Sequence, residues 1–250
     1  MATHRYEPVP VARLAENLRR VSERLDAAAK RSGREPGSVR LVAVTKYVGV
    51  DEIRALLKLG VKELGENRIQ LARPKIAELA EDVAAAGARW RMIGHLQTNK
   101  AKPALQDFAA IDAVDSIRLL ESLAKEAGKR GRAQVPCLAE VNISGEKQKH
   151  GLRPDELRPF LERASALPQI DIQGLMTMAP FSDEPEVTSR PVFEGLRKLA
   201  EDTNARSVYP RPLRELSMGM TQDYEMAIEE GATLVRVGSA LYEERGASSE

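Results

Sequence analysis

Lys46 is the residue whose type and position point most directly to covalent chemistry. It follows an apolar run at residues 41–44 and Thr45, so its ammonium is expected at the C-terminal end of a strand. A lysine that loses part of its hydration favours the neutral amine, and a neutral amine attacks an aldehyde to form a Schiff base. A surface lysine just past a strand is the alternative, and position alone does not decide between the two.

Arg236 is a permanent cation inside an otherwise apolar run at residues 233–237. A guanidinium in such a run needs a partner. A neighbouring carboxylate would satisfy it, and so would the ring nitrogen of a bound ligand.

Two turns near the C-terminus could bind an anion. Residues 217–220, which begin with Ser217, lead into a predicted helix near residue 221, and Gly238 and Ser239 precede another helical segment. Free backbone N–H groups and hydroxyls at such turns can receive an anion, and loops after the last two strands of a barrel recurrently bind phosphate. Turns that bind no ligand would have much the same sequence.

Four further residues lie at predicted strand ends, where a small polar ligand could meet them. Asn67 and His95 occur in segments dense in hydrogen-bonding groups, and Asn142 ends the fifth predicted strand. Met176 ends the sixth, where packing is as good an explanation as ligand contact. His95 could equally be an ordinary loop or helix-capping histidine.

The segments that must position these residues alternate between two sequence patterns. Short apolar runs rich in β-branched residues predict strands, and the amphipathic stretches between them predict helices. Repeated strand–helix order indicates a parallel sheet, and eight units in this length favour a single (β/α)₈ barrel of the α/β class. The predicted strands are residues 41–45, 61–64, 90–93, 111–114, 135–141, 170–176, 213–216 and 233–237.

The chain is expected to form one domain with an additional N-terminal helix. Apolar residues recur at steps of three and four over residues 9–32, and the barrel is expected over residues 38–245. Residues 179–186 carry two prolines and predict a loop after the sixth strand rather than a domain boundary.

Composition excludes several classes of function. The 250 residues carry 38 Lys and Arg against 37 Asp and Glu, so no overall basic field favours nucleic acid. No apolar run is long enough to span a membrane, and no signal peptide is evident. Cys137 alone cannot form an internal disulfide, and neither it nor His4, His95 or His150 has paired metal-ligand spacing. We therefore expect a cytoplasmic protein without a metal site.

Six ordered motifs together resemble the pyridoxal phosphate homeostasis protein family, and the match covers nearly the full chain. The resemblance implies a barrel like the N-terminal domain of alanine racemase. The motifs are LVAVTK at residues 41–46, GEN at 65–67, IGHLQTNK at 93–100, GLMTM at 174–178, LSMGM at 216–220 and VRVGS at 235–239.

The resemblance also implies a cofactor, pyridoxal 5′-phosphate (PLP), bound as a Schiff base to Lys46. Arg236 matches the arginine that faces the pyridine nitrogen. Other residues match the phosphate-binding turns or line the mouth by position, and Tyr47 and residues 242–244 depart from the usual pattern. The implied phosphate-binding residues are Ser217, Gly238 and Ser239, and the implied or candidate mouth residues are Asn67, His95, Asn142 and Met176.

Three functions remain open on this basis. An arginine at the ring nitrogen weakens the cofactor as an electron sink, and the chain is expected to lack the second domain that supplies an opposing catalytic tyrosine in racemases. The expected function is therefore PLP homeostasis by a monomer that buffers the cofactor or delivers it to PLP-dependent apoenzymes, without turnover. A PLP-dependent amino-acid racemase is the alternative, and a Schiff-base aldolase without cofactor is a third possibility.

Overall fold

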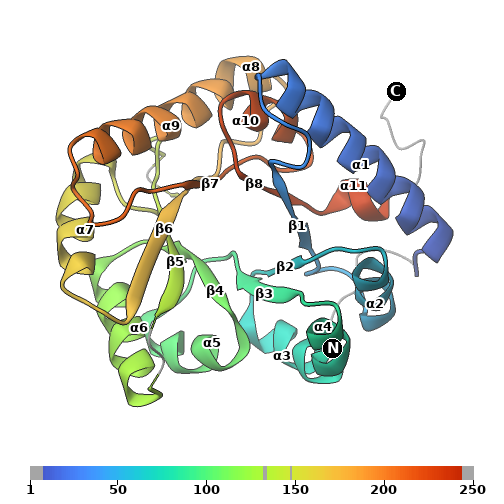
Figure 1. The fold of residues 1–250 in the computed structure, drawn as a ribbon, viewed down its shortest axis with the longest axis horizontal. Coiled ribbons are helices and arrows are strands. Elements are labelled where there is room, and N and C mark those ends of the chain that lie inside the picture. The colour runs from blue at the N-terminus through green and yellow to red at the C-terminus, as the bar shows by residue number, and fades with distance from the viewer. Residues whose placement is uncertain (1–7, 132–133, 147, 244–250) are drawn as a thin grey trace.

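The computed structural model describes residues 8–131, 134–146 and 148–243. Eight parallel strands close into a barrel in sequence order, with β8 paired to β1, and the helices surround it (Figure 1). This confirms the predicted (β/α)₈ fold. His4 and Glu244 lie outside the described residues. The strands are β1 (Arg40–Val44), β2 (Glu63–Glu66), β3 (Arg89–Met92), β4 (Ala110–Val114), β5 (Val135–Glu140), β6 (Ile170–Met176), β7 (Glu215–Ser217) and β8 (Leu234–Val237).

The predicted N-terminal helix is also confirmed as α1, and it packs on the outside of the barrel. No helix among the described residues combines the length and apolarity needed to cross a membrane. The α-helices are α1 (Val11–Arg31), α2 (Val50–Lys58), α3 (Ile69–Glu78), α4 (Ala80–Ala85), α5 (Ala101–Asp107), α6 (Ile117–Lys129), α7 (Leu157–Ser165), α8 (Pro185–Thr188), α9 (Arg190–Ala205), α10 (Tyr224–Glu229) and α11 (Ser239–Tyr242).

Five predicted strands differ from the structure by one residue at one or both ends, and two other strands and one loop differ by more. The second strand begins and ends two residues later than predicted. The seventh begins two residues later and ends one residue later. Part of the apolar signal of each comes from residues that precede the strand and pack beside it. Val61, for example, donates its N–H to the carbonyl of Leu56 at the end of α2. The sequence predicts that the loop after β6 extends to Glu186, but the loop ends where α8 begins at Pro185. Proline is favoured at the first position of a helix.

Closure of the barrel brings the two ends of the sequence together. In the register of the β1–β8 pair, Val42 lies beside Arg236 and Ala43 beside Val237. Lys46 follows the end of β1, and Gly238 follows the end of β8. Because parallel strands place their carboxyl ends on the same rim, this pairing positions Lys46 next to the turn at Gly238.

The barrel interior has an apolar layer and a charged one. Val42, Ala113, Leu138, Met176 and Leu234 form the apolar cluster. The charged layer centres on Arg91, which is 1% exposed and whose guanidinium donates both to Asp112 (2.7 Å to each oxygen) and to Glu63 (3.3 Å). These contacts compensate the cost of burying the cation.

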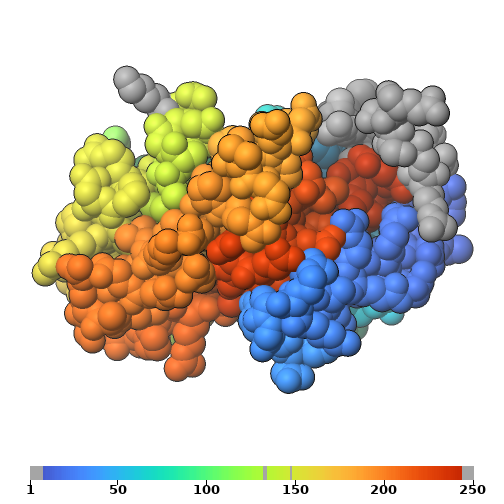
Figure 2. All heavy atoms as spheres, turned by 90° about the horizontal axis from the view of Figure 1, so that it is seen from above, coloured from blue at the N-terminus to red at the C-terminus, as the bar shows by residue number. Residues whose placement is uncertain are grey.

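Helix α1 is attached to the barrel by polar contacts as well as apolar packing. The buried Asn17 amide donates to the carbonyls of Leu241 and Glu243, at 3.1 Å each. In Figure 2 the blue N-terminal segment lies against the red C-terminal one. These contacts hold α1 across the segment that follows β8.

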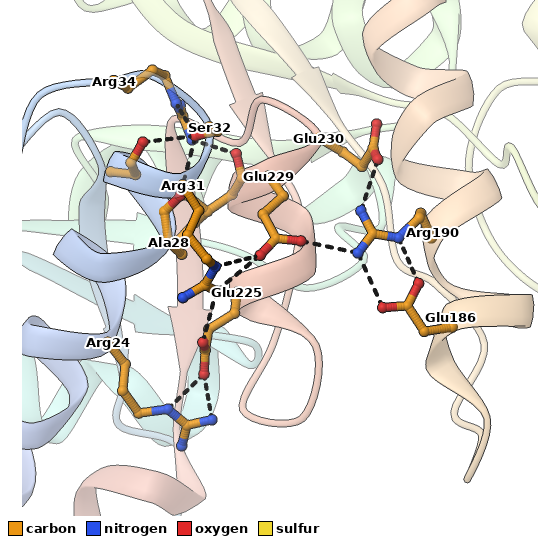
Figure 3. Close-up of polar contacts among 12 residues, drawn as sticks. Arg24, Ala28, Arg31, Ser32, Arg34, Glu186, Arg190, Glu225, Glu229 and Glu230 are labelled. Atoms are coloured by element: carbon orange, nitrogen blue, oxygen red, sulfur yellow. Dashed lines mark hydrogen bonds and ion pairs between the residues drawn. The ribbon is translucent and has the colours of Figure 1, made fainter.

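A network of arginines and glutamates links α1, α10 and α9 on the outer surface (Figure 3). Glu229 of α10 lies at its centre, since its carboxylate accepts from Arg31 of α1 and from Arg190 of α9, each at 2.9 Å. The two arginines hold the pKa of Glu229 below its ordinary value of 4.5. Charges organised in a network contribute more than isolated surface pairs.

Replacing Glu229 with Gln should lower the Tm by about 2–4 °C at low ionic strength, because two arginines lose their shared carboxylate. The effect should shrink in high salt. It should also weaken below about pH 4.5 and vanish once the pH has fallen through the lower folded-state pKa of Glu229, because the carboxylate stabilises only while it is ionised. Differential scanning calorimetry at two salt concentrations tests this. Glu23→Gln is the control, since Glu23 pairs only within α1. Equal effects of the two variants would contradict the account.

Candidate functional site

A pocket of about 320 Å³ opens at the rim where β1 and β8 end. It joins four of the residues that the sequence singles out, Lys46, Arg236, Gly238 and Ser239. Its volume lies within the range of small-ligand sites. The remaining lining residues are Val44, Tyr47, Phe181, Met220, Thr221, Gln222 and Tyr242.

Arg236 forms the inner part of this pocket, although it is only 4% exposed. Its guanidinium donates to the hydroxyl of Ser217 at 2.7 Å and to the carbonyl of Thr177 at 2.9 Å. Burial lowers the pKa of Arg236, and the charges of Asp112, Glu140 and Asp223 oppose that shift. The cation is therefore held by neutral acceptors, and carboxylates act on it through their charge.

The turn that follows β8 lines the same pocket and offers donors suited to an anion. Gly238 and Ser239 begin the turn into α11, and the Gly238 N–H points to the hydroxyl of Thr221 at 3.4 Å. The loop that carries Thr221 comes close because Gly219 has a φ of +90° and its carbonyl accepts from the Arg236 N–H at 3.0 Å. A Cβ on Gly219 would lie 2.5 Å from that of Ala227. The backbone here requires glycine.

Ser217 and Met176, two of the predicted site residues, lie behind the pocket rather than along it. Ser217 ends β7, is fully buried, and its hydroxyl accepts from Arg236. Met176 is fully buried in the apolar layer of the barrel. In this structure Ser217 orients the arginine, and Met176 packs beneath the site.

The other mouth residues lie around a separate hollow or in a loop. Asn67 and His95 line a hollow of about 400 Å³ between the ends of β2 and β3. Asn142 follows β5, where its amide donates to the Glu146 carbonyl at 2.9 Å and its oxygen accepts from the Gly145 N–H at 3.1 Å. Asn142 thus shapes the loop after β5.

Two histidines that are distant in sequence meet beside this hollow. His95 Nδ1 lies 2.8 Å from Asp115 Oδ2, and the His150 ring stacks on the His95 ring at 3.7 Å with an angle of 10° between planes. Asp115 and the two histidines could each offer a metal ligand. The lone pair of an imidazole nitrogen lies in the plane of its ring. Because the two rings are stacked in nearly parallel planes, an ion in the plane of one ring lies outside the plane of the other. This arrangement would have to change before both rings could bind one ion.

Several pocket residues have no clear signal in the sequence. The Tyr47 ring lies beneath the Lys46 ammonium, with Nζ 4.8 Å from its centroid, a cation–π distance. Tyr242 and the exposed Phe181 complete an aromatic rim. Tyr47 and Tyr242 are positions at which the chain departs from the pattern of the family it resembles, and both line the pocket.

Glu140 is a buried carboxyl group at the end of β5 that the sequence does not single out. It is 2% exposed, and its Oε2 atom has no hydrogen-bond partner among the described residues. Burial, and then the charge of Asp115, raise the pKa of Glu140 to about 7, against a smaller opposing effect of Arg236. Glu140 therefore changes charge near neutral pH, close to the cation of the pocket.

Comparison with known proteins agrees with this geometry. The family model described as "Alanine racemase, N-terminal domain" matches residues 11–245. A pyridoxal phosphate homeostasis protein of Aquifex aeolicus is 38% identical over 230 residues, which cover 92% of this chain and 97% of the relative. The human protein of the same name is 32% identical over 93% of this chain and 87% of its own.

The chain belongs to the pyridoxal phosphate homeostasis protein family.

Solved structures place the family in a wider fold group. PipY of Synechococcus elongatus, described with PLP bound, is 35% identical, with a TM-score of 0.76 over 89% of this chain and 100% of its own. Alanine racemase from Corynebacterium glutamicum is 15% identical, with a TM-score of 0.67 over 97% of this chain and 63% of its own. The second likeness shows the fold alone, and it confirms the predicted alanine racemase-like barrel.

Replacing Glu140 with Gln should stabilise the ligand-free protein at pH 8 and have little effect near pH 4.5. A carboxyl group whose pKa rises from 4.5 to about 7 on folding binds its proton more tightly in the folded state. Folding stability therefore falls as the pH rises through that interval, by up to about 3 kcal/mol for a shift of this size. Urea denaturation at the two pH values measures the difference. A Glu140→Gln variant that is equally destabilised at both would contradict the raised pKa.

Proposed function

We propose that this protein holds PLP covalently on Lys46 and acts in intracellular PLP homeostasis, as a reservoir or donor of the cofactor rather than as a catalyst. The observation that carries the proposal is the meeting of Lys46, Arg236 and the turn at Gly238 in one pocket. The PLP-bound structure of PipY supports it, because that family member aligns over most of this chain.

Lys46 would supply the covalent attachment. PLP contributes an aldehyde, which condenses with an amine. One amine and one aldehyde give one carbon–nitrogen double bond and one water, with no oxidation or reduction. The neutral form of an amine is the nucleophile in this step, and the Lys46 Nζ lies 4.8 Å from the centroid of the Tyr47 ring.

The donors at the turn that follows β8 would receive the phosphate. Gly238 and Ser239 offer backbone N–H groups, and Ser239 and Thr221 offer hydroxyls. Such groups bind phosphate at the ends of the last barrel strands. Ser217 would contribute indirectly, since it orients the Arg236 guanidinium.

Arg236 is the reason for proposing storage rather than turnover. A guanidinium remains protonated and has no acceptor atom, so it can only donate to a ring nitrogen. Beside such a donor, the nitrogen would keep its lone pair and the ring would withdraw electrons weakly. Transaminase-like carbanion chemistry would therefore be disfavoured.

An amino-acid racemase is the second candidate. It is favoured by the shared fold of alanine racemase, a likeness that establishes architecture but no activity at 15% identity. A Schiff-base aldolase without cofactor explains Arg236 less well, because a transient substrate needs no partner for a ring nitrogen.

We further propose that the protein works as a cytoplasmic monomer and that apoenzymes with a reactive lysine receive the cofactor. The exposed rim residue Phe181 leaves the pocket mouth accessible to a recipient. Incubating the loaded protein with a PLP-dependent apoenzyme, separated by a membrane or mixed directly, distinguishes direct transfer from release into solution.

Wild-type protein incubated with PLP should become yellow, and Lys46→Ala should abolish the Schiff-base absorbance. Borohydride reduction followed by peptide mapping should locate the adduct on Lys46, because this residue shares its pocket with the turn proposed to bind phosphate. Lys100→Ala is the matched control, since Lys100 lines the separate hollow. A colourless wild type, or an adduct that maps to another lysine, would refute the proposal.

Loaded wild-type protein should not exchange the Cα hydrogen of free amino acids for deuterium at a catalytic rate. The weak electron withdrawal expected beside Arg236 would leave that proton barely acidified. NMR of amino acids incubated in D₂O with the protein measures the exchange. Rapid exchange that Lys46→Ala abolishes would support the racemase instead.

A further inference from the structure

Thr45, the residue immediately before Lys46, has all of its polar groups bound. Its N–H donates to the Gly65 carbonyl at 3.0 Å, and its hydroxyl donates to Glu66 Oε1 at 2.7 Å. Its carbonyl accepts from the Lys75 ammonium at 2.8 Å and from the Val48 N–H at 3.2 Å. Thr45 is fully buried, so water does not compete for these bonds.

The two charged partners of Thr45 form a buried ion pair. Lys75 of α3 lies 3.0 Å from Glu66 at the end of β2, and their side chains are 7% and 0% exposed. The second oxygen of Glu66, Oε2, has no hydrogen-bond partner. Apolar side chains of similar volume often stabilise an interior as well as such a pair does. The distinctive contribution of this pair is to orient Thr45, because both of its members form hydrogen bonds with that residue.

A bond to the Thr45 carbonyl also fixes the start of Lys46. The carbonyl of Thr45 and the nitrogen of Lys46 belong to one rigid, planar peptide unit. Strand β1 ends at Val44, so this unit lies beyond the strand itself. Lys75 and the Val48 N–H both bind this carbonyl oxygen, so together they set the plane from which the Lys46 side chain leaves the backbone. Val48 lies in the same turn as Lys46, whereas Lys75 ties the peptide unit to a distant helix.

We propose that Lys75 and Glu66 are positioning residues that act through Thr45 to aim the Lys46 amine into the pocket. This inference rests on the proposed function, because it concerns the attachment of PLP to Lys46. Neither residue lines the pocket, so the pair should affect the covalent step and leave the recognition of phosphate and ring intact. A loosened peptide unit would make productive approach of the amine rarer, by about 10- to 100-fold for a misplacement near 1 Å.

Two variants separate this role from general stability. Thr45→Val removes only the hydroxyl that bonds Glu66, and the double variant Glu66→Gln with Lys75→Met removes both charges together. Leu123→Ala in α6 is the control, because it opens a cavity in the core without touching β1 or β2. The rate of PLP attachment is followed by absorbance. Non-covalent affinity is measured with pyridoxine 5′-phosphate, which has an alcohol in place of the aldehyde.

The proposal predicts that the double variant attaches PLP about 10- to 100-fold more slowly and that Thr45→Val shows a smaller loss, while both bind pyridoxine 5′-phosphate like the wild type. Leu123→Ala should attach PLP at the wild-type rate. Wild-type attachment by both folded variants would overturn the proposal, as would an equal loss of attachment and of pyridoxine 5′-phosphate affinity. If either variant fails to fold, the other decides. A wild type that binds pyridoxine 5′-phosphate but never attaches PLP would instead refute the proposed function.

Discussion

A guanidinium buried at the end of β8 is the constraint around which the site is organised. Arg236 cannot lose its charge at physiological pH, so the surrounding strands must supply acceptors. The hydroxyl of Ser217 and the carbonyl of Thr177 do so from the ends of β7 and β6. The position of the cation thereby fixes the geometry of three consecutive strand ends. Its charge would also determine how strongly a bound pyridine ring could withdraw electrons.

Barrel closure converts this local arrangement into a pocket. Lys46 and Gly238 are separated by most of the sequence, yet the pairing of β1 with β8 makes them neighbours on one rim. An open sheet with β1 and β8 at opposite edges would keep them apart. The covering helix α1 spans the same junction from outside, where Asn17 bonds the backbone that follows β8. The fold thus accounts for the meeting of an amine, a cation and the turn that we propose to bind phosphate.

The parts of the site that could be predicted from sequence are those with strong local signals. Lys46 follows an apolar strand, and Arg236 interrupts one, so both are conspicuous against their neighbours. The barrel could also be predicted, because the alternation of apolar runs and amphipathic stretches is itself a strong local signal. Contacts between distant segments left no such mark: Lys75 looks like any helical lysine, and the stacking of His95 on His150 depends on the shapes of two loops. The sequence predicts that Ser217 lies at the end of the seventh strand, but only the structure shows that its hydroxyl accepts a hydrogen bond from Arg236.

The most direct test of the proposed role of Arg236 is the ¹⁵N NMR shift of the pyridine nitrogen in PLP bound to the wild-type protein. If Arg236 faces that nitrogen, the shift should be that of an unprotonated, hydrogen-bonded pyridine throughout the pH range in which the protein is folded. A shift typical of a protonated pyridinium at neutral pH would contradict the assigned role of Arg236, and with it the argument for storage over turnover.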